Sequence, residues 1–563
     1  MSQIQQVKRR WTTQSLAWLL AVTLAAGTAG LSMPAAAAAQ QGSTGSAAGP
    51  GGGQAPAGQS TGQAAQGNGH ITPEQAKQLF ALVDVLMKFA SDDSGLPIKS
   101  TVKRRLTTRA AVEAYLEEKF NDDESAKRLE RDEIVLKKFG LLDHDFELKP
   151  FLLALLKEQI EAYYDSKTKT VNLLDWVDAD EQKPVLAHEL THALQDQHSD
   201  LEKWDDQTPD DVSTDASGDQ DHLARDEMDT ARDAVAEGQA TAVMMDYILK
   251  PLGKSLVKDP EIMDRLKDQM TTSENSPVMA RAPLLLSESM IFPYRDGLSF
   301  EQDIWMDEGQ TAAFAGALDR PPTSTWEIIN PRVYERKQIP AIPLLPDFHP
   351  LTDKLYKPYD IGQVGELDVR ILTELFGGDE ASVELTPAWN GGVYWAGQLR
   401  SATPAEQETT KSLALFYLSV WKNETAANDF ARMYADNLGR KYSDVHLATK
   451  AASAGSSDGG GVEQVYSTSE GPVAITTRGK MVFVAESFPI DLARKLTTLM
   501  LDAQGSGDLR MAALPKTRGP GAAASGRAQP ELEPLSGDLV RFMDDCGVMK
   551  AVVDAEMRAT APR

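Results

Sequence analysis

Two histidines and a glutamate in one short stretch have the types and the spacing needed for metal-dependent chemistry. Residues 188–192 read His-Glu-Leu-Thr-His. On a helix, four residues turn a side chain by only about 40°, so His188 and His192 share a face and can bind one metal ion. Glu189 lies about 100° from His188, where its carboxylate can take a proton from a water molecule on that metal. The pattern therefore predicts Glu189 as a general base beside a metal held by two imidazoles.

A catalytic zinc site needs a third protein ligand and an open position for water, and two residues downstream are candidates. Glu237, in the run Ala-Glu-Gly-Gln-Ala-Thr, lies on the next expected helix. The rival is His198, which could reach the metal only if the chain turned sharply after His192. Such a turn needs a glycine, and the position holds Gln195. We therefore predict His188, His192 and Glu237 as the ligands and expect His198 to continue the same helix, beyond reach of the metal.

The residues around Glu237 are suited to supporting a ligand. Asp233 and Thr241 lie four residues to either side, share its helix face and are expected to hydrogen-bond a ligand. Gly238 is small, which lets this helix pack closely against a neighbour. Hydrolysis at a metal also needs a donor for the oxyanion, and Tyr294 and Arg295 are possible donors, although we interpret their surroundings as a structural turn.

The motifs together resemble those of a known enzyme group. Residues 186–198 and 236–241 resemble secreted bacterial zinc metallopeptidases of the gluzincin type, in particular a group that joins His-Glu-x-x-His to a downstream Glu-Gly-x-Ala-Thr. Residues 163–174 and 321–325 are also similar to that group. The group often continues into His-Pro, where this chain has Asn330-Pro331.

The resemblance is specific over residues 160–335 and loose over residues 360–500. It implies that the three predicted ligands bind one zinc ion per chain and that Glu189 is the catalytic base. It implies a gluzincin-like fold and a peptide or protein substrate, without identifying that substrate.

The helices and strands that position these residues are predicted to form a mainly helical domain with a small edge sheet. Two short strands are expected within 163–174, and the strand at Val171 to Leu174 is expected to offer backbone to an extended peptide. His222, in an acidic connector between the two site helices, is expected at the surface. Helices are expected from Thr72 through Leu86 and over residues 110–120, 125–139, 150–163, 181–199 and 222–250, with residues 251–345 mostly helical.

The pattern changes at about residue 350, where a smaller α+β domain begins. A turn at Arg478-Gly479-Lys480 between two apolar runs is typical of a β-hairpin. Helices are expected over residues 366–376, 411–434 and 491–501, and strands over 392–398, 471–477 and 481–487.

The first forty residues have the layout of an export signal. A basic start (Lys8 to Arg10) precedes an apolar stretch from Leu16 to about Leu31, with small residues suited to cleavage near Ala39. We therefore predict a cleaved signal peptide and a periplasmic or extracellular protein. Arg9-Arg10 leaves Sec and Tat export open.

These patterns divide the chain into six segments. They are a signal peptide (1–39), a disordered linker (40–69), the metallopeptidase-like domain (70–350), the smaller α+β domain (351–502), a second disordered linker (503–535) and a C-terminal helix (536–563).

The composition of the chain excludes some classes of binding partner. The chain has 563 residues and a formal net charge of −26, which argues against non-specific binding to nucleic acid or anionic membranes because the long-range field repels both. Cys546 is the only cysteine, which excludes an internal disulfide framework and a cysteine-based zinc cluster. We expect a peptide or protein partner, no nucleic acid, and no membrane span once the signal is cleaved. The sequence does not indicate the oligomeric state.

Two hypotheses for function follow. The first is an exported zinc-dependent hydrolase, a metallopeptidase that cleaves peptide bonds with a zinc-activated water and Glu189 as general base. The alternative is a non-catalytic exported binding or scaffold protein that keeps a structural metal site. An open fourth coordination position favours the enzyme, and a fourth protein ligand favours the scaffold.

Overall fold

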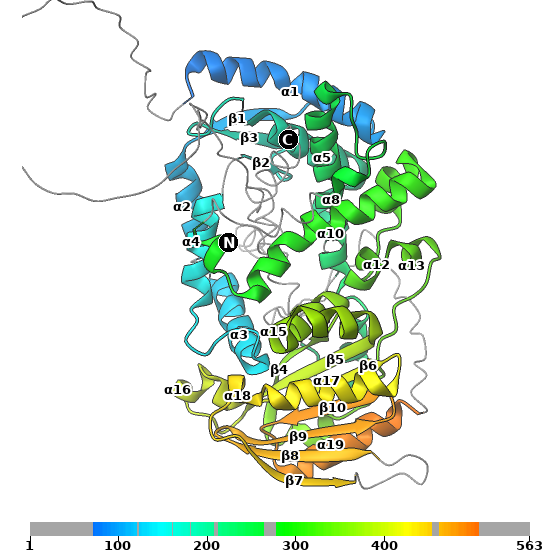
Figure 1. Cartoon of the computed structure of the whole chain (residues 1–563). Coiled ribbons are helices and arrows are strands. Elements are labelled where there is room, and N and C mark those ends of the chain that lie inside the picture. Colours follow the sequence, from blue (N-terminus) through cyan, green and yellow to red (C-terminus); the bar gives the residue numbers. More distant parts are fainter. Residues whose placement is uncertain are drawn as a thin grey trace, which may run out of the picture.

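The structure of the chain is a computed structural model with a mixed α+β architecture (Figure 1). It describes residues 71–120, 123–159, 162–180, 182–205, 207, 212–263, 277–452 and 461–505. The expected signal peptide, the first linker, nearly all of the second linker and the C-terminal helix lie outside the described residues, so they remain predictions. No helix in the described part of the chain is long and apolar enough to cross a membrane.

The N-terminal part is mainly helical. Its first helix begins as expected, because Thr72 and Gln75 form a reciprocal capping box at the N-terminus. Its helices are α1 (Pro73–Ser94), α2 (Arg109–Phe120), α3 (Asp123–Phe139), α4 (Leu148–Gln159), α5 (Gln182–Ser199), α6 (Leu201–Asp205), α7 (Ala216–Leu223), α8 (Met228–Leu249), η2 (Lys250–Leu252), η3 (Met279–Arg281), α10 (Leu284–Glu308), η4 (Ala312–Gly316), α11 (Ala317–Asp319), α12 (Thr325–Ile329), α13 (Pro331–Glu335) and α14 (His349–Thr352).

A three-stranded sheet lies beside these helices, in the order β1-β3-β2. The two expected strands are confirmed as β2 (Ala162–Asp165) and β3 (Thr170–Leu174), and β1 (Lys103–Thr107) was not expected. β3 pairs with β1 in parallel and with β2 antiparallel, so it is the middle strand. The expectation that β3 offers its backbone to a peptide is therefore wrong, since both of its edges are already paired.

The C-terminal part is a seven-stranded antiparallel sheet in the order β4-β5-β6-β10-β9-β8-β7. Helices α15 and α17 cover one face of the sheet and α19 covers the other (Figure 1). The buried side chains of the sheet pack against these helices. Its elements are β4 (Tyr356–Gln363), α15 (Glu366–Leu385), η5 (Thr386–Ala388), β5 (Trp389–Leu399), α16 (Pro404–Gln407), η6 (Thr410–Ser412), β6 (Leu413–Trp421), α17 (Glu424–Asp436), α18 (Leu438–Lys441), β7 (His446–Ala452), β8 (Val462–Thr468), β9 (Gly471–Arg478), β10 (Met481–Glu486) and α19 (Ile490–Ala503).

The expected helix over residues 411–434 is wrong in its first half and confirmed in its second. The first half of that stretch is β6, and α17 begins after Asn423, whose side chain accepts the N–H of Ala426. β6 is covered on both faces, so all of its residues are buried and its sequence shows no alternation. A continuous apolar run of this kind cannot be told from a buried helix by periodicity alone.

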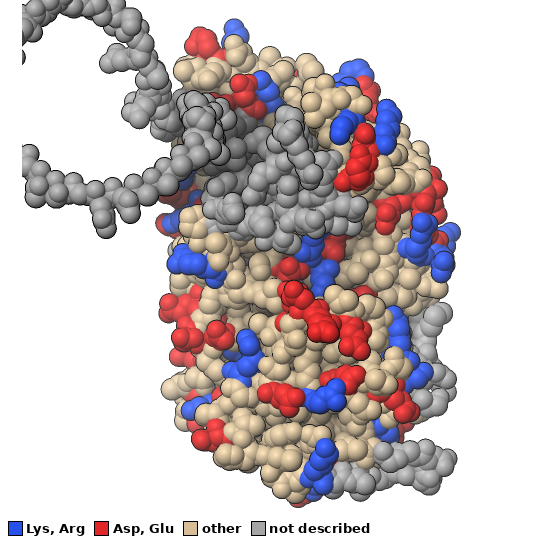
Figure 2. Space-filling model, in the orientation of Figure 1, with Lys and Arg blue, Asp and Glu red and all other residues tan. Residues whose placement is uncertain are grey.

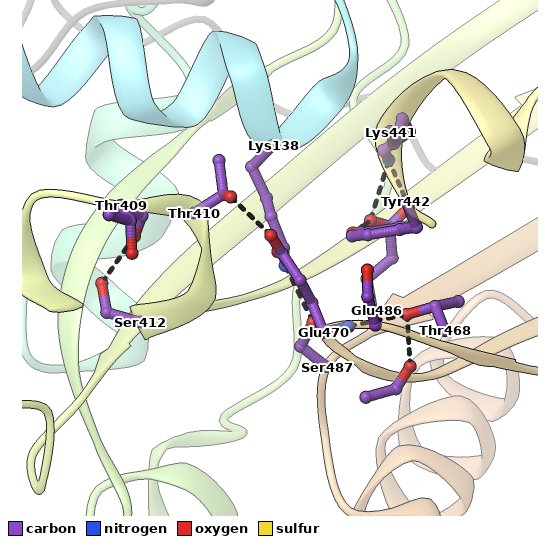
Figure 3. A network of polar contacts seen from close by, with 12 residues as sticks. Lys138, Thr409, Thr410, Ser412, Lys441, Tyr442, Thr468, Glu470, Glu486 and Ser487 are labelled. Carbon is purple, nitrogen blue, oxygen red and sulfur yellow. Dashed lines mark hydrogen bonds and ion pairs between the residues drawn. The ribbon is translucent and has the colours of Figure 1, made fainter. Parts of the chain in front are cut away.

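Polar contacts join the helical part to the sheet. Lys138, near the end of α3, donates to Glu470 Oε2 at 2.9 Å and to Ser487 Oγ at 2.8 Å. Lys441 binds Glu486, with Nζ 2.6 Å from Oε1 and 2.8 Å from Oε2 (Figure 3). We name Lys138, Lys441, Glu470 and Glu486 the lysine cluster.

One hydrophobic core contains side chains from both parts, from Leu79 in α1 to Val484 in β10. The two parts are therefore packed directly on each other, and a domain boundary at residue 350 remains a prediction. On the face that Figure 2 shows, acidic and basic side chains are interspersed over the described surface.

Candidate metal centre

Two helices that cross the interior, α5 and α8, position the predicted ligands. α5 carries Pro184 in its first turn, where the missing N–H costs no helical hydrogen bond. Residues 185–196 of α5 and 228–246 of α8 are buried without exception. These helices pack on all sides, so the polar side chains on them have to find partners inside the protein.

The three predicted ligands lie together. His188 Nε2 is 3.0 Å from Glu237 Oε2, and His192 Nε2 is 3.5 Å from Glu237 Oε1. One ligand atom from each of the three lies within 4.8 Å of the others, and each residue is at most 2% exposed. We name His188, His192 and Glu237 the His–Glu cluster. Among the residues that the structure describes, no other set of histidine, cysteine and carboxylate side chains meets this spacing.

Glu189, the predicted base, is held against strand β2. The Tyr164 N–H donates to Glu189 Oε2 at 2.8 Å. Two turns further along α5, the Tyr164 hydroxyl donates to Asp196 Oδ2 at 2.7 Å, and Lys169 forms an ion pair with the same carboxylate. These contacts fix α5 against the sheet at two points, so the direction of the Glu189 carboxylate is set by backbone.

A contact between two glycines brings a further residue to the cluster. A Cβ atom at Gly238 of α8 would collide with the Gly297 carbonyl of α10, and a Cβ at Gly297 would collide with the Ala234 carbonyl. The predicted close packing at Gly238 is thereby confirmed. Tyr294, one turn before Gly297, stacks on the His188 ring with centroids 6.4 Å apart. Its hydroxyl hydrogen-bonds Glu237.

Burial controls the charge of the cluster. It lowers the pKa of His188 to about 3 and also lowers the pKa of His192, so both imidazoles are neutral at pH 7. Burial raises the pKa of Glu237, against the Tyr294 hydrogen bond, and raises the pKa of Glu189, with a further rise from the Glu237 charge. Two carboxylates at this depth resist ionising together unless a cation lies between them.

The outer ring nitrogen of His192 is bonded as well. His192 Nδ1 lies 2.7 Å from Gln195 Oε1, and Gln195 in turn bonds Gln239 on α8. These two glutamines were not identified from the sequence. Gln195 was considered only as the residue that replaces a glycine, although its spacing of three from His192 places both on one helix face.

Of the other expectations at the site, some are confirmed and others are wrong. His198 does continue α5, and its Nε2 lies 3.0 Å from Asp319, outside the cluster. Thr241 Oγ1 has no hydrogen-bond partner among the described residues, so its expected supporting role is wrong. For Asp233 that role remains a prediction. The turn expected around Tyr294 is also wrong, since residues 284–308 form the continuous helix α10.

His222 was expected at the surface, but the structure buries it. It is 1% exposed, and its Nε2 lies 3.2 Å from Asp226 Oδ1, just before α8 begins. The acidic composition of the connector suggested solvent exposure, but this stretch is covered by β4, where Gln363 N donates to Asp226.

No protein-family model, curated protein or solved structure gives a match to this chain. The gluzincin resemblance of the motifs therefore remains a prediction, and the site is interpreted from its own chemistry.

Proposed function

We propose that this protein is an exported zinc-dependent hydrolase, a metallopeptidase of the gluzincin type, in which Glu189 is the general base. The observation that carries the proposal is the His–Glu cluster with Glu189 held beside it. Two imidazoles and one carboxylate are the donor set of a catalytic zinc site with one position left for water. Within the described residues no fourth metal-binding side chain joins the three.

The charges in this region support a divalent ion. Glu237 and Glu189 would carry a formal charge of −2 when ionised, because the two histidines are neutral. A divalent cation at the cluster balances that charge. It also makes ionised carboxylates favourable at a depth where they otherwise keep their protons.

Each residue of the site has a distinct role in the proposed reaction. His188, His192 and Glu237 hold the zinc, which when bound supplies a Lewis acid that lowers the pKa of water and polarises the scissile carbonyl. Glu189 accepts a proton from the attacking water and passes it to the leaving amine. The Tyr164 N–H keeps the Glu189 carboxylate in position through the transfer. The resemblance of the motifs is what assigns a peptide substrate.

The first test is metal content, measured by elemental analysis of purified, dialysed protein. We expect about one zinc per chain. His188→Ala should lose the zinc. His198→Ala is the matched control, since it removes a histidine from the same helix at a place outside the cluster, and it should keep the zinc. Zinc loss in His198→Ala alone would mean that the third ligand is wrongly assigned.

The second test separates binding from catalysis. Glu189→Gln should retain zinc and lose hydrolysis of a peptide library by about 100-fold or more, because the general base is removed while the ligands remain. An equal rate in Glu189→Gln and the unmodified protein would exclude Glu189 as the base.

One observation favours the alternative, a non-catalytic binding or scaffold protein. The His–Glu cluster and Glu189 are each at most 2% exposed, as a structural metal site would be. Cobalt substitution distinguishes the two, because a cobalt spectrum that responds to added anions or hydroxamates indicates an open coordination position. An unresponsive, tetrahedral spectrum would favour the scaffold.

A further inference from the structure

We infer that Gln195, Gln239 and the π-helical turn η4 (Ala312–Gly316) form a hydrogen-bond chain that positions His192 as a ligand. This inference rests on the proposed function for its purpose, but its geometry is independent of it. His192 Nδ1 lies 2.7 Å from Gln195 Oε1, and Gln195 Nε2 donates to Gln239 Oε1 at 2.9 Å. Gln239 Nε2 donates to the backbone carbonyls of Ala313 and Phe314 at 2.9 and 3.0 Å.

The direction of every hydrogen bond in this chain is fixed from its far end. The carbonyls of Ala313 and Phe314 can only accept, so the amide nitrogen of Gln239 has to face them and its oxygen has to face Gln195. Gln195 must then donate with its nitrogen and present its oxygen to His192. A second carbonyl, that of Ala236, accepts from Gln195 Nε2 at 2.9 Å and imposes the same orientation.

This orientation of the amides determines the tautomer of the His192 imidazole. Since Gln195 Oε1 can only accept, His192 Nδ1 carries the hydrogen, and Nε2 carries the lone pair. Nε2 is the atom that lies 3.5 Å from Glu237. The chain therefore selects the tautomer in which the nitrogen facing the cluster is able to bind a metal, before any metal arrives.

Burial makes this selection strict. Gln195, Gln239 and His192 are all 0% exposed, so water is not available to reverse an amide or to satisfy the other tautomer. The acceptors belong to η4, where the regular α-helical hydrogen bonding gives way to a π turn. Gln239 and Gln195 touch no substrate in this scheme, so they are positioning residues that act through His192.

The test compares Gln195→Leu, which removes the acceptor of His192 Nδ1 itself, with Gln302→Leu. Gln302 is a matched control, because it is a buried glutamine that donates to the Leu256 carbonyl at 2.9 Å without any bond to the His–Glu cluster. The zinc affinity of each protein is measured by competition with a chelator. We expect Gln195→Leu to lower it by tenfold or more and Gln302→Leu to leave it unchanged. Equal affinities in both variants and in the unmodified protein would overturn the inference.

A conservative variant separates positioning from packing. Gln195→Glu, as a buried acid that keeps its proton, has an oxygen that accepts from His192 Nδ1 and an O–H that donates toward Ala236 and Gln239, whereas Gln195→Leu has neither. Zinc affinity should be lost in Gln195→Leu and largely restored in Gln195→Glu. Equal loss in both would indicate that the residue acts only by filling space.

A measurement without metal keeps this inference distinct from the proposed function. Nitrogen-15 NMR of the metal-free protein reports the tautomer of each histidine. In the unmodified protein and in Gln302→Leu, His192 should be protonated at Nδ1, and in Gln195→Leu it should be a mixture of the two tautomers. If the protein bound no zinc but showed this pattern, the proposed function would fail and the hydrogen-bond chain would stand. An Nε2-protonated His192 in the unmodified protein would overturn the chain.

Discussion

The lysine cluster and the His–Glu cluster are both deeply buried, yet only the first contains its own cations. In the lysine cluster, Glu470 and Glu486 each pair with an ammonium group, at 2.9 and 2.6 Å. Lys441 and Glu486 are at most 1% exposed in their side chains. In the His–Glu cluster the only basic groups are imidazoles, and burial keeps them neutral.

The pKa values record this difference. Burial raises the pKa of Glu486, but the charges of Lys441 and Lys138 lower it by a larger amount. The pKa of Glu486 is therefore below its ordinary value. Burial lowers the pKa of Lys441 to about 8, which leaves it protonated at pH 7. At Glu237 nothing comparable opposes burial, and its pKa is raised. The lysine cluster is thus complete within the chain, whereas the His–Glu cluster has no charged basic group of its own and could bind a metal ion.

The largest effect is expected on breaking the lysine cluster. Lys441→Met leaves Glu486 buried without its nearest cation and should lower the free energy of unfolding by about 3–5 kcal/mol. Urea denaturation measures this. Lys88→Met is the control, since Lys88 pairs with Asp92 at the surface with about two thirds of each side chain exposed, and it should cost less than about 0.5 kcal/mol. Similar losses in both variants would show that Lys441 contributes little through its charge.

Zinc should stabilise the protein through the other cluster. A ligand that binds only the folded state adds about 4 kcal/mol at a concentration 1,000 times its Kd. Thermal unfolding with and without zinc should show this gain in the unmodified protein and in Lys441→Met, and not in Glu237→Ala. If Lys441→Met abolished the zinc effect, the two clusters could not be treated as independent.

A further effect distinguishes the buried carboxylates of the sheet by the pH dependence of stability. The stability that Glu486 contributes is present above the ordinary carboxyl pKa and is lost as the pH falls through its lowered folded value. The contribution of Asp360, near the start of the sheet, changes with pH in the opposite direction, because burial raises the pKa of Asp360 from 3.8 to about 7. The folded protein therefore binds more protons than the unfolded chain between these values, and stability falls as the pH rises through them.

Asp360→Asn tests this sign. The variant removes the ionisable group and keeps an oxygen that can accept from the Tyr394 hydroxyl, which lies 2.8 Å from Asp360. It should be more stable than the unmodified protein at pH 8 by about 4 kcal/mol, since that is the free energy of raising a pKa from 3.8 to about 7, with little difference at pH 4. Denaturation at the two pH values measures it, and a gain that is equal at both would contradict a raised pKa.

The smallest effect is expected at Tyr294. Tyr294→Phe keeps the ring against His188 and removes the hydroxyl that bonds Glu237. Since a single hydrogen bond contributes about 1 kcal/mol, zinc affinity should fall by about fivefold. Chelator competition is sensitive enough to detect this. An unchanged affinity would show that Glu237 is positioned without Tyr294.

The site could be predicted because most of its residues are close together in the sequence. His188, Glu189 and His192 lie on one helix, so their relation could be worked out from helix geometry alone. The pairing with Glu237 depended on the donor chemistry that zinc requires, and the structure brings it to the others. Gln239 could not have been found this way, because its role depends on carbonyls at residues 313 and 314 that are distant in sequence.

The same distinction applies to the fold. Elements with a local signal were predicted, such as the helix that starts at Thr72 and the hairpin at Gly479, whose φ of 57° favours glycine. β6 was mistaken for a helix because its character depends on helices covering both faces, which no local pattern reveals. His222 was misplaced for the same reason, since β4 covers it from more than a hundred residues away.

The contact between Gly238 and Gly297 has a consequence for finding relatives of this chain. Neither glycine can gain a side chain without the two helices moving apart, so Gly238 and Gly297 have to change together or not at all. Relatives that keep the same crossing should retain Glu-Gly on one helix and Tyr-x-x-Gly on the other, even after the rest of the sequence has diverged. This pair of short patterns can be searched for where whole-chain comparison gives no match.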